Sequence, residues 1–205
     1  MFARGFTARM GLGLVWLLAA GTGFALVLNY QRASGRTGTA PEHWPATAQI
    51  TPDTKRDTLV MFAHPLCPCT RASMEELNRL LARHHGQVTA HVVFIQPETF
   101  TAGQVQSGLW QSAAAMPEVA VHTDTNGVQA KLFGAETSGY VLLYDAQGRL
   151  LFRGGITGGR GHAGDNAGED DVGTLLGGEV VHEQQTPVYG CSLLNPERAS
   201  GGSPK

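Results

Sequence analysis

A chain of 205 residues is long enough for one domain with a hydrophobic core and short appendages. Its hydrophobic content of 42% and charged content of 16% are those of a globular protein. The net charge of −2 and the lack of a basic tract in the sequence argue against nucleic-acid binding. Three cysteines are too few for a disulfide scaffold, and their odd number leaves at least one thiol free, metal-bound or paired with another molecule.

The first feature in chain order is an apolar run, MGLGLVWLLAAGTGFALVL, over residues 10–28. It contains no charged residue and is long enough to cross the hydrocarbon core of a bilayer as a helix. Arginines at positions 4 and 9 precede the run and arginines at 32 and 36 follow it. The positive-inside rule therefore favours a cytoplasmic N-terminus only when the α-amino group is counted. We expect residues 1–30 to form a single membrane anchor.

The alternative for this run is a cleavable signal peptide. Gly23 and Ala25 have the small side chains of a cleavage site, but the apolar run continues past them, which favours an uncleaved anchor. With either segment the remaining chain lies outside the cytoplasm, which in bacteria means the oxidising periplasm. We therefore expect a single-pass protein of the inner membrane whose domain faces the periplasm.

Between the apolar run and the first strong strand pattern, the chain is rich in Ser, Thr, Gly, Ala and Pro. Residues 31–54, QRASGRTGTAPEHWPATAQITPDT, have the composition of a linker, with a weak strand pattern at 48–51. Residues 195–205, NPERASGGSPK, have the composition of a disordered tail. The sequence thus predicts a folded domain over residues 55–194.

Within this domain, apolar runs and helical spacing alternate. Strands are predicted over residues 58–63, 88–95, 119–122, 140–144 and 149–152. Helices are predicted over residues 70–84, 104–115, 127–133 and 169–176. The turn at 145–148 makes the last two strands a hairpin, and a glycine-rich loop follows at 154–168. This order indicates an α/β fold with a parallel core and an antiparallel hairpin at the end.

Two of the three cysteines lie at the junction between the first strand and the first helix of the domain. The stretch HPLCPCTRASMEEL, residues 64–77, contains both Cys67 and Cys69. Unpaired backbone N–H groups and the helix dipole at such a junction favour the thiolate. A protonated His64 and the side chain of Arg71 would add positive charge beside it. The pattern therefore predicts a reactive cysteine.

The same stretch resembles thioredoxin-fold proteins, especially the membrane-anchored TlpA/ResA-like group, whose typical motif is Cys-Pro-Pro-Cys-Arg-Ala-Glu-Met. Without gaps, Cys67 aligns with the attacking cysteine of that motif. YVLLYDAQGRLLFRGG, residues 140–155, is similar to the hairpin that closes the thioredoxin sheet, and the resemblance covers roughly residues 55–178. The segments HPLCPCT, GRGHAGDN and TPVYGC are similar to a RedB-like branch. The resemblance implies a thioredoxin-like fold, with a central mixed sheet flanked by helices.

The chain departs from the pattern of that group at two positions. Thr70 stands where the group has its resolving cysteine, and the second cysteine has moved inward to position 69. The cis-proline that faces the active-site sulfurs in the group should fall near Gly139, but Thr137-Ser138-Gly139 contains no proline. Despite these departures we still expect the thioredoxin-like fold. The departures argue against the standard dithiol chemistry of a CxxC motif.

Two partners are open for Cys67. Cys69 is the first candidate, although the small ring of an i, i+2 disulfide is strained. Cys191, in TPVYGCSLL beyond the last helix, is the second, if this segment folds back over the helix start. The alternative for Cys191 is a small buried apolar residue. We expect Cys67, Cys69 and Cys191 to be the catalytic residues of thiol–disulfide exchange on a protein client of the cell envelope, without a cofactor.

Two other functions remain open. One is delivery of copper or another soft metal, since thiolate and imidazole ligands suit such ions. The available side chains are those of His64, Cys67, Cys69, His162, His182 and Cys191, but their spacing matches no zinc or CxxxC copper motif. The other is a redox-silent interaction module that keeps the fold and uses its surface.

Overall fold

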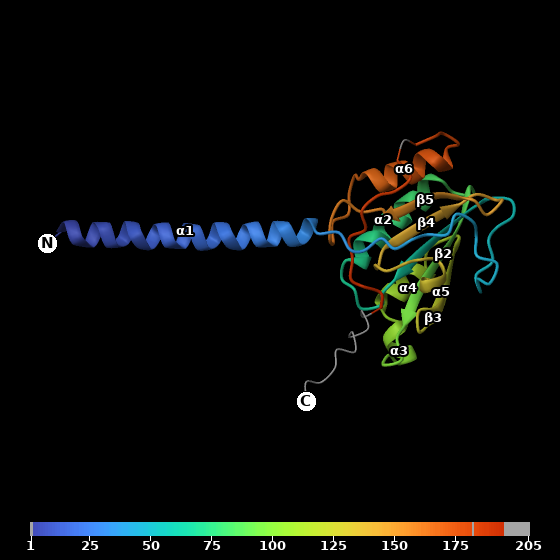
Figure 1. Cartoon of the computed structure of the whole chain (residues 1–205), viewed down its shortest axis with the longest axis horizontal. Helices are drawn as coiled ribbons and strands as arrows, with labels where there is room; N and C mark the ends of the chain where they lie inside the picture. The colour runs from blue at the N-terminus through green and yellow to red at the C-terminus, as the bar shows by residue number, and fades with distance from the viewer. Residues whose placement is uncertain (1, 182, 195–205) are drawn as a thin grey trace, which may run out of the picture. The chain divides into compact units, whose positions relative to one another are not determined.

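The computed structural model describes residues 2–181 and 183–194 (Figure 1). It divides into two units between Ala33 and Ser34, and each unit is described by itself. The residues predicted as a disordered tail, 195–205, lie outside the described part of the chain.

The N-terminal unit is one helix, α1 (Phe2–Arg32). Its portion Gly11–Arg32 has a mean hydropathy of 2.0, so it is long and apolar enough to cross a membrane. The prediction of one N-terminal helix that fits a membrane span is confirmed.

The second unit is built on a five-stranded mixed sheet of order β3-β2-β1-β4-β5. The strands are β1 (Asp57–Ala63), β2 (Val88–Gln96), β3 (Val119–Thr125), β4 (Tyr140–Tyr144) and β5 (Leu150–Gly155). β2 runs parallel to both β1 and β3, whereas β4 runs antiparallel to both β1 and β5. The predicted parallel core with a terminal antiparallel hairpin is confirmed.

Helices cover one face of this sheet, and a helix together with extended chain covers the other. The helices are α2 (Thr70–Arg83), α3 (Ala102–Val105), α4 (Gly108–Ala114), α5 (Val128–Leu132) and α6 (Ala167–Leu176). Apolar residues of α2, α4 and α6 pack on one face of the sheet. The opposite face is covered by α5 and by parts of the extended segments 40–50 and 188–193.

β1 is central and buried on both faces, which explains its continuous apolar run. Leu59, Met61 and Ala63 face the layer that contains α2. Val60 and Phe62 face the layer of extended chain. The residues that follow this strand, including Cys67 and Cys69, therefore begin at one edge of the core.

The helix predicted over 104–115 is two short helices, α3 and α4. The chain leaves helical geometry around Ser107, whose hydroxyl donates to the Pro65 carbonyl oxygen at 3.1 Å. A serine that bonds to backbone competes with the helix, and Gly103 and Gly108 weaken helical propensity on either side. α6 begins two residues before its predicted start, because the Asn166 side chain caps it by accepting from the Glu169 N–H at 3.0 Å.

The predicted linker over 31–54 differs from the structure, because from Ser34 onward the chain belongs to the folded unit. Ala40 and Ile50 are buried in the core layer. The Trp44 ring lies edge-on to Phe133 and Tyr144, with ring centroids 5.1 and 5.2 Å away. No strand forms within this stretch at 48–51. The apolar side chains scattered among polar ones bury surface, and this binds the segment to the domain.

This packing predicts a stability effect at Trp44. We expect Trp44→Ala to lower the free energy of unfolding by about 2 kcal/mol, because it removes a half-buried aromatic side chain with two ring contacts. Urea denaturation of the detergent-solubilised chain measures the change. Trp16→Ala, in the separate helix α1, is the matched control and should leave the midpoint of the domain unchanged. Equal midpoints for Trp44→Ala and the wild type would show that the segment contributes nothing to folding.

Candidate redox site

Cys67 and Cys69 lie in the turn between β1 and α2. The Cys67 N–H donates to the His64 carbonyl oxygen at 3.1 Å, and the Thr70 N–H donates to the Cys67 carbonyl oxygen at 3.1 Å. Cys69 is the residue immediately before α2. These turn bonds hold both thiols at the N-terminus of a helix whose apolar face is anchored in the core.

A second segment brings the third cysteine to this turn. Beyond α6 the chain runs back in extended form, and Thr137 and Ser192 form an antiparallel bridge. The Ser138 N–H donates to the Cys191 carbonyl oxygen at 2.8 Å, and Leu193 N–H donates to the Glu136 carbonyl oxygen at 2.9 Å. As a result the Sγ atoms of Cys67 and Cys191 lie 2.9 Å apart. We call residues 188–194 the return segment.

Gly190 allows the return segment to approach so closely. A Cβ atom at this position would lie 1.9 Å from the Ser138 carbonyl oxygen, well inside van der Waals contact. Only glycine fits without moving one backbone away from the other. The neighbouring residues Val188 and Leu193 are buried and anchor the segment on either side.

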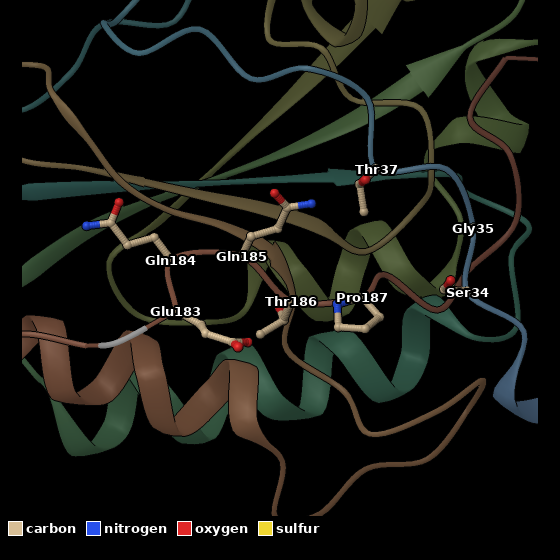
Figure 2. A pocket seen from close by; sticks show the side chains of 8 residues that line it. All are labelled: Ser34, Gly35, Thr37, Glu183, Gln184, Gln185, Thr186 and Pro187. Carbon is tan, nitrogen blue, oxygen red and sulfur yellow. The ribbon is translucent and has the colours of Figure 1, made fainter.

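The start of the return segment is also tied to the N-terminal stretch of the domain. The Gly35 N–H donates to the Val188 carbonyl oxygen at 2.7 Å. A pocket of about 530 Å³ lies between this stretch and residues 183–187. Figure 2 shows the side chains that line it. None of the three cysteines lines that pocket, which therefore lies outside the candidate site.

The three thiols are free in the structure, and Cys67 is the central one. It is hydrogen-bonded to the Cys191 thiol and the Thr70 hydroxyl, and it also hydrogen-bonds to Cys69. Burial alone would raise the pKa of Cys67, but the hydrogen bonds from Cys191 and Thr70 outweigh burial and lower it. Cys67 is therefore the sulfur most readily deprotonated.

The two outer thiols have the opposite tendency. Burial, the hydrogen bond to Cys67 and the charge of Cys67 together raise the pKa of Cys191 to about 12. Burial and the charge of Cys67 also raise the pKa of Cys69. In the reduced site the thiol that deprotonates most readily thus lies beside two thiols that hold their protons more tightly, which is the arrangement of a nucleophile with adjacent partners.

A pair of hydroxyls supports the thiol cluster. Thr70, at the position of the resolving cysteine in TlpA/ResA-like proteins, has its Oγ1 2.6 Å from Ser138 Oγ. Ser138 Oγ also accepts from the His64 N–H at 2.8 Å. The loop that contains Thr137, Ser138 and Gly139 thus faces the cysteine turn, although it contains no proline. Ser138 was not predicted to be part of the site, and its signal in the sequence is the expected position of that loop.

The positive charge at the thiols comes from Arg160, whereas the sequence predicted His64 and Arg71. Burial lowers the pKa of His64, so its ring is neutral at pH 7. Arg71 is exposed on the first turn of α2. Arg160, from the glycine-rich loop, hydrogen-bonds to Cys69 and donates from Nη1 to the Gly190 carbonyl oxygen at 2.7 Å.

Of the candidate metal ligands, the structure brings the three cysteines together but does not add a histidine to them among the described residues. Among residues 2–181 and 183–194, no group of three or more His, Cys, Asp and Glu side chains is arranged to hold a metal ion. The His64 Nδ1 accepts from the Leu66 N–H, and the His162 ring is exposed beside the Arg160 carbonyl oxygen. His182 lies outside the described residues.

Two solved structures share this architecture over most of the chain. An uncharacterised conserved protein from Geobacillus kaustophilus is 19% identical, with a TM-score of 0.62 over 82% of this chain and 98% of that one. A hypothetical protein from Sinorhizobium meliloti is 20% identical, with a TM-score of 0.58 over 80% and 96% of the two chains. A secreted disulfide oxidoreductase from Mycobacterium tuberculosis, homologous to E. coli DsbE, is 15% identical, with a TM-score of 0.45 over 62% and 83%.

The chain has a thioredoxin-like fold. In this thioredoxin-like domain the cysteine turn leads from the central strand into α2, and the β4–β5 hairpin closes the sheet. Neither a protein-family model nor a curated protein sequence matches the chain. The resemblance to a RedB-like branch therefore stays a prediction.

Proposed function

We propose that this protein is a membrane-anchored thiol–disulfide exchange protein of the bacterial cell envelope, with Cys67 and Cys191 as its redox pair. The observation that carries the proposal is the 2.9 Å contact between the Sγ atoms of these two cysteines, which are far apart in sequence. A helix start that favours a thiolate and a second thiol held against it are the two requirements of the reaction.

The first step is attack by the Cys67 thiolate on a client disulfide. A bond forms between Cys67 Sγ and one client sulfur, and the client S–S bond breaks. The other client sulfur leaves as a thiolate and takes a proton from solvent. The hydrogen bonds that lower the pKa of Cys67 favour the deprotonated form of the attacking sulfur.

The second step is attack by Cys191 on the Cys67 sulfur of the mixed disulfide. Once Cys67 is bonded to the client, its negative charge is gone, and with it two of the causes that raise the pKa of Cys191. Cys191 then gives its proton to solvent, bonds to Cys67 and releases the second client sulfur as a thiolate. Two electrons have moved from the protein to the client, and the reverse sequence oxidises a client dithiol.

A client reaches Cys67 only after the site opens, since Cys67 is 1% exposed and its Sγ atom contacts that of Cys191 in the return segment. A groove of about 1050 Å³ runs alongside this segment. Its lining includes His64, Phe100, Lys131, Arg160, Ser192 and Leu193. The groove gives a client polypeptide room to dock beside the cysteines.

The helix α1 supports a membrane location for the reaction. As an uncleaved inner-membrane anchor it would hold the thioredoxin-like domain in the periplasm, where disulfides persist. Tethering restricts the domain to clients at the membrane surface.

A thiol redox titration of the full chain in detergent tests the proposal. The protein is equilibrated over a series of dithiothreitol potentials, alkylated, and mapped by mass spectrometry of its peptides. We expect one bond, Cys67–Cys191, to form and break reversibly. No bond to Cys67 at any potential would refute the exchange function, and a Cys67–Cys69 bond alone would refute the assignment of Cys191.

A further inference from the structure

We infer that Arg160 is a positioning residue for the exchange reaction, because it links the return segment to the Cys69 sulfur and holds both around Cys67. The inference rests on the proposed function and adds to it a residue outside the cysteine motif. Arg160 lies in the glycine-rich loop, far in sequence from Cys69.

The loop that carries Arg160 is itself fixed to the domain. Glu76, on α2 and only 1% exposed, accepts from the Gly164 N–H. The Asn166 side chain donates to the Gly164 carbonyl oxygen at 2.9 Å and caps α6. The turn around Arg160 is closed by the His162 N–H, which donates to the Gly159 carbonyl oxygen at 3.3 Å. Arg160 therefore extends from a supported backbone rather than from a free loop.

The guanidinium of Arg160 makes two contacts that belong to different segments. Its Nη1 donates to the carbonyl oxygen of Gly190, the residue before Cys191, at 2.7 Å. It also hydrogen-bonds to Cys69 at the start of α2. A planar guanidinium with several donors suits such a double contact, and a lysine ammonium would make it less well. Loss of this side chain would free the return segment next to its reactive residue.

The charge of Arg160 also acts in the direction that the second step needs. It lowers the pKa of Cys191 and of Cys69, against the larger effects of burial and the Cys67 charge. In the mixed disulfide Cys67 carries no charge. The negative charge of Cys67 then no longer opposes the lowering of the Cys191 pKa by Arg160. Position and charge thus both favour attack by Cys191.

The test compares Arg160→Gln, Arg160→Lys and the control Arg153→Gln in the full chain. Arg153 also contacts the C-terminal stretch, through Gln185 at 3.0 Å, but Gln185 lines the pocket of Figure 2, which none of the cysteines lines. We expect Arg160→Gln to weaken the Cys67–Cys191 disulfide about tenfold, which raises its reduction potential by about 30 mV. Alkylation of Cys69 should require higher pH, and Arg160→Lys should restore the pH profile more than the potential. Arg153→Gln should match the wild type in both.

Three results would overturn the inference. If the wild type forms the disulfide but Arg160→Gln has the same potential and the same Cys69 profile, Arg160 does not position the site and the proposed function stands. If Arg160→Gln and Arg160→Lys both lower the urea midpoint, and the change in reduction potential follows the loss of stability in each variant, the role of Arg160 is structural. If the wild type forms no bond to Cys67, the proposed function and this inference fail together.

Discussion

Cys191→Ser is expected to stop the reaction at the mixed disulfide and to slow turnover by about a hundredfold or more. The reason is that an intramolecular attack by a thiol already in contact with Cys67 is replaced by attack from a thiol in solution. The first step needs only Cys67 and should still occur. The variant should therefore accumulate a covalent adduct on Cys67.

Oxidised glutathione serves as the probe for this result. The reduced wild type should end as an intramolecular disulfide with two glutathione thiols released for each chain. Cys191→Ser should instead retain one glutathione on Cys67, which intact mass and peptide mapping detect.

Cys69→Ser is the matched control, because it removes a neighbouring thiol of the same cluster. We expect it to form the Cys67–Cys191 bond and to release both glutathione molecules. If Cys69→Ser retains the adduct and Cys191→Ser does not, the resolving cysteine is Cys69 and the assignment of Cys191 is wrong.

Gly190→Ala is expected to weaken the Cys67–Cys191 disulfide by about a hundredfold while the domain stays folded. The new Cβ atom would meet the Ser138 carbonyl oxygen at 1.9 Å, so the return segment must move away from the loop that holds it. A disulfide has a narrow range of allowed geometries and departures from it store several kcal/mol of strain, so such a displacement is enough to weaken the bond by about a hundredfold. The redox titration described above measures the equilibrium constant directly.

Gly158→Ala is the control for this variant. A Cβ atom there would lie 3.8 Å from the Asn166 side chain, which is an ordinary contact, and Gly158 is exposed. We expect the wild-type potential for Gly158→Ala and a far more easily reduced disulfide for Gly190→Ala. Circular dichroism and urea denaturation establish that both variants are folded. A folded Gly190→Ala variant with the wild-type potential would show that close approach of the two segments is not required.

Elements with a strong local pattern were predicted well. The apolar run that became β1 and the helical spacing of α2 were read from neighbouring residues, since burial on both faces and one apolar stripe each leave a local signature. The single helix predicted over 104–115 failed because a side chain–backbone bond from Ser107 to Pro65 interrupts it. That hydrogen bond joins distant parts of the chain, so it cannot be predicted from the pattern of neighbouring residues.

The packing of residues 34–54 was missed for a related reason. Their composition is that of a linker, and their few apolar side chains show no periodicity. What retains the segment is the surface it meets, including the rings of Phe133 and Tyr144 beneath Trp44. Composition describes the segment alone and contains nothing about that surface.

The sequence by itself determined that two cysteines lie at a helix start in an α/β domain. It also determined that this domain follows, along the chain, a helix that fits a membrane span. These features depend on residues close together in the chain. Only the tertiary structure decided that Cys191 contacts Cys67, that Ser138 supports the turn and that Arg160 is the cation at the thiols. Each of these contacts closes a long loop of chain, and the free energy that closes it comes from burial elsewhere in the core.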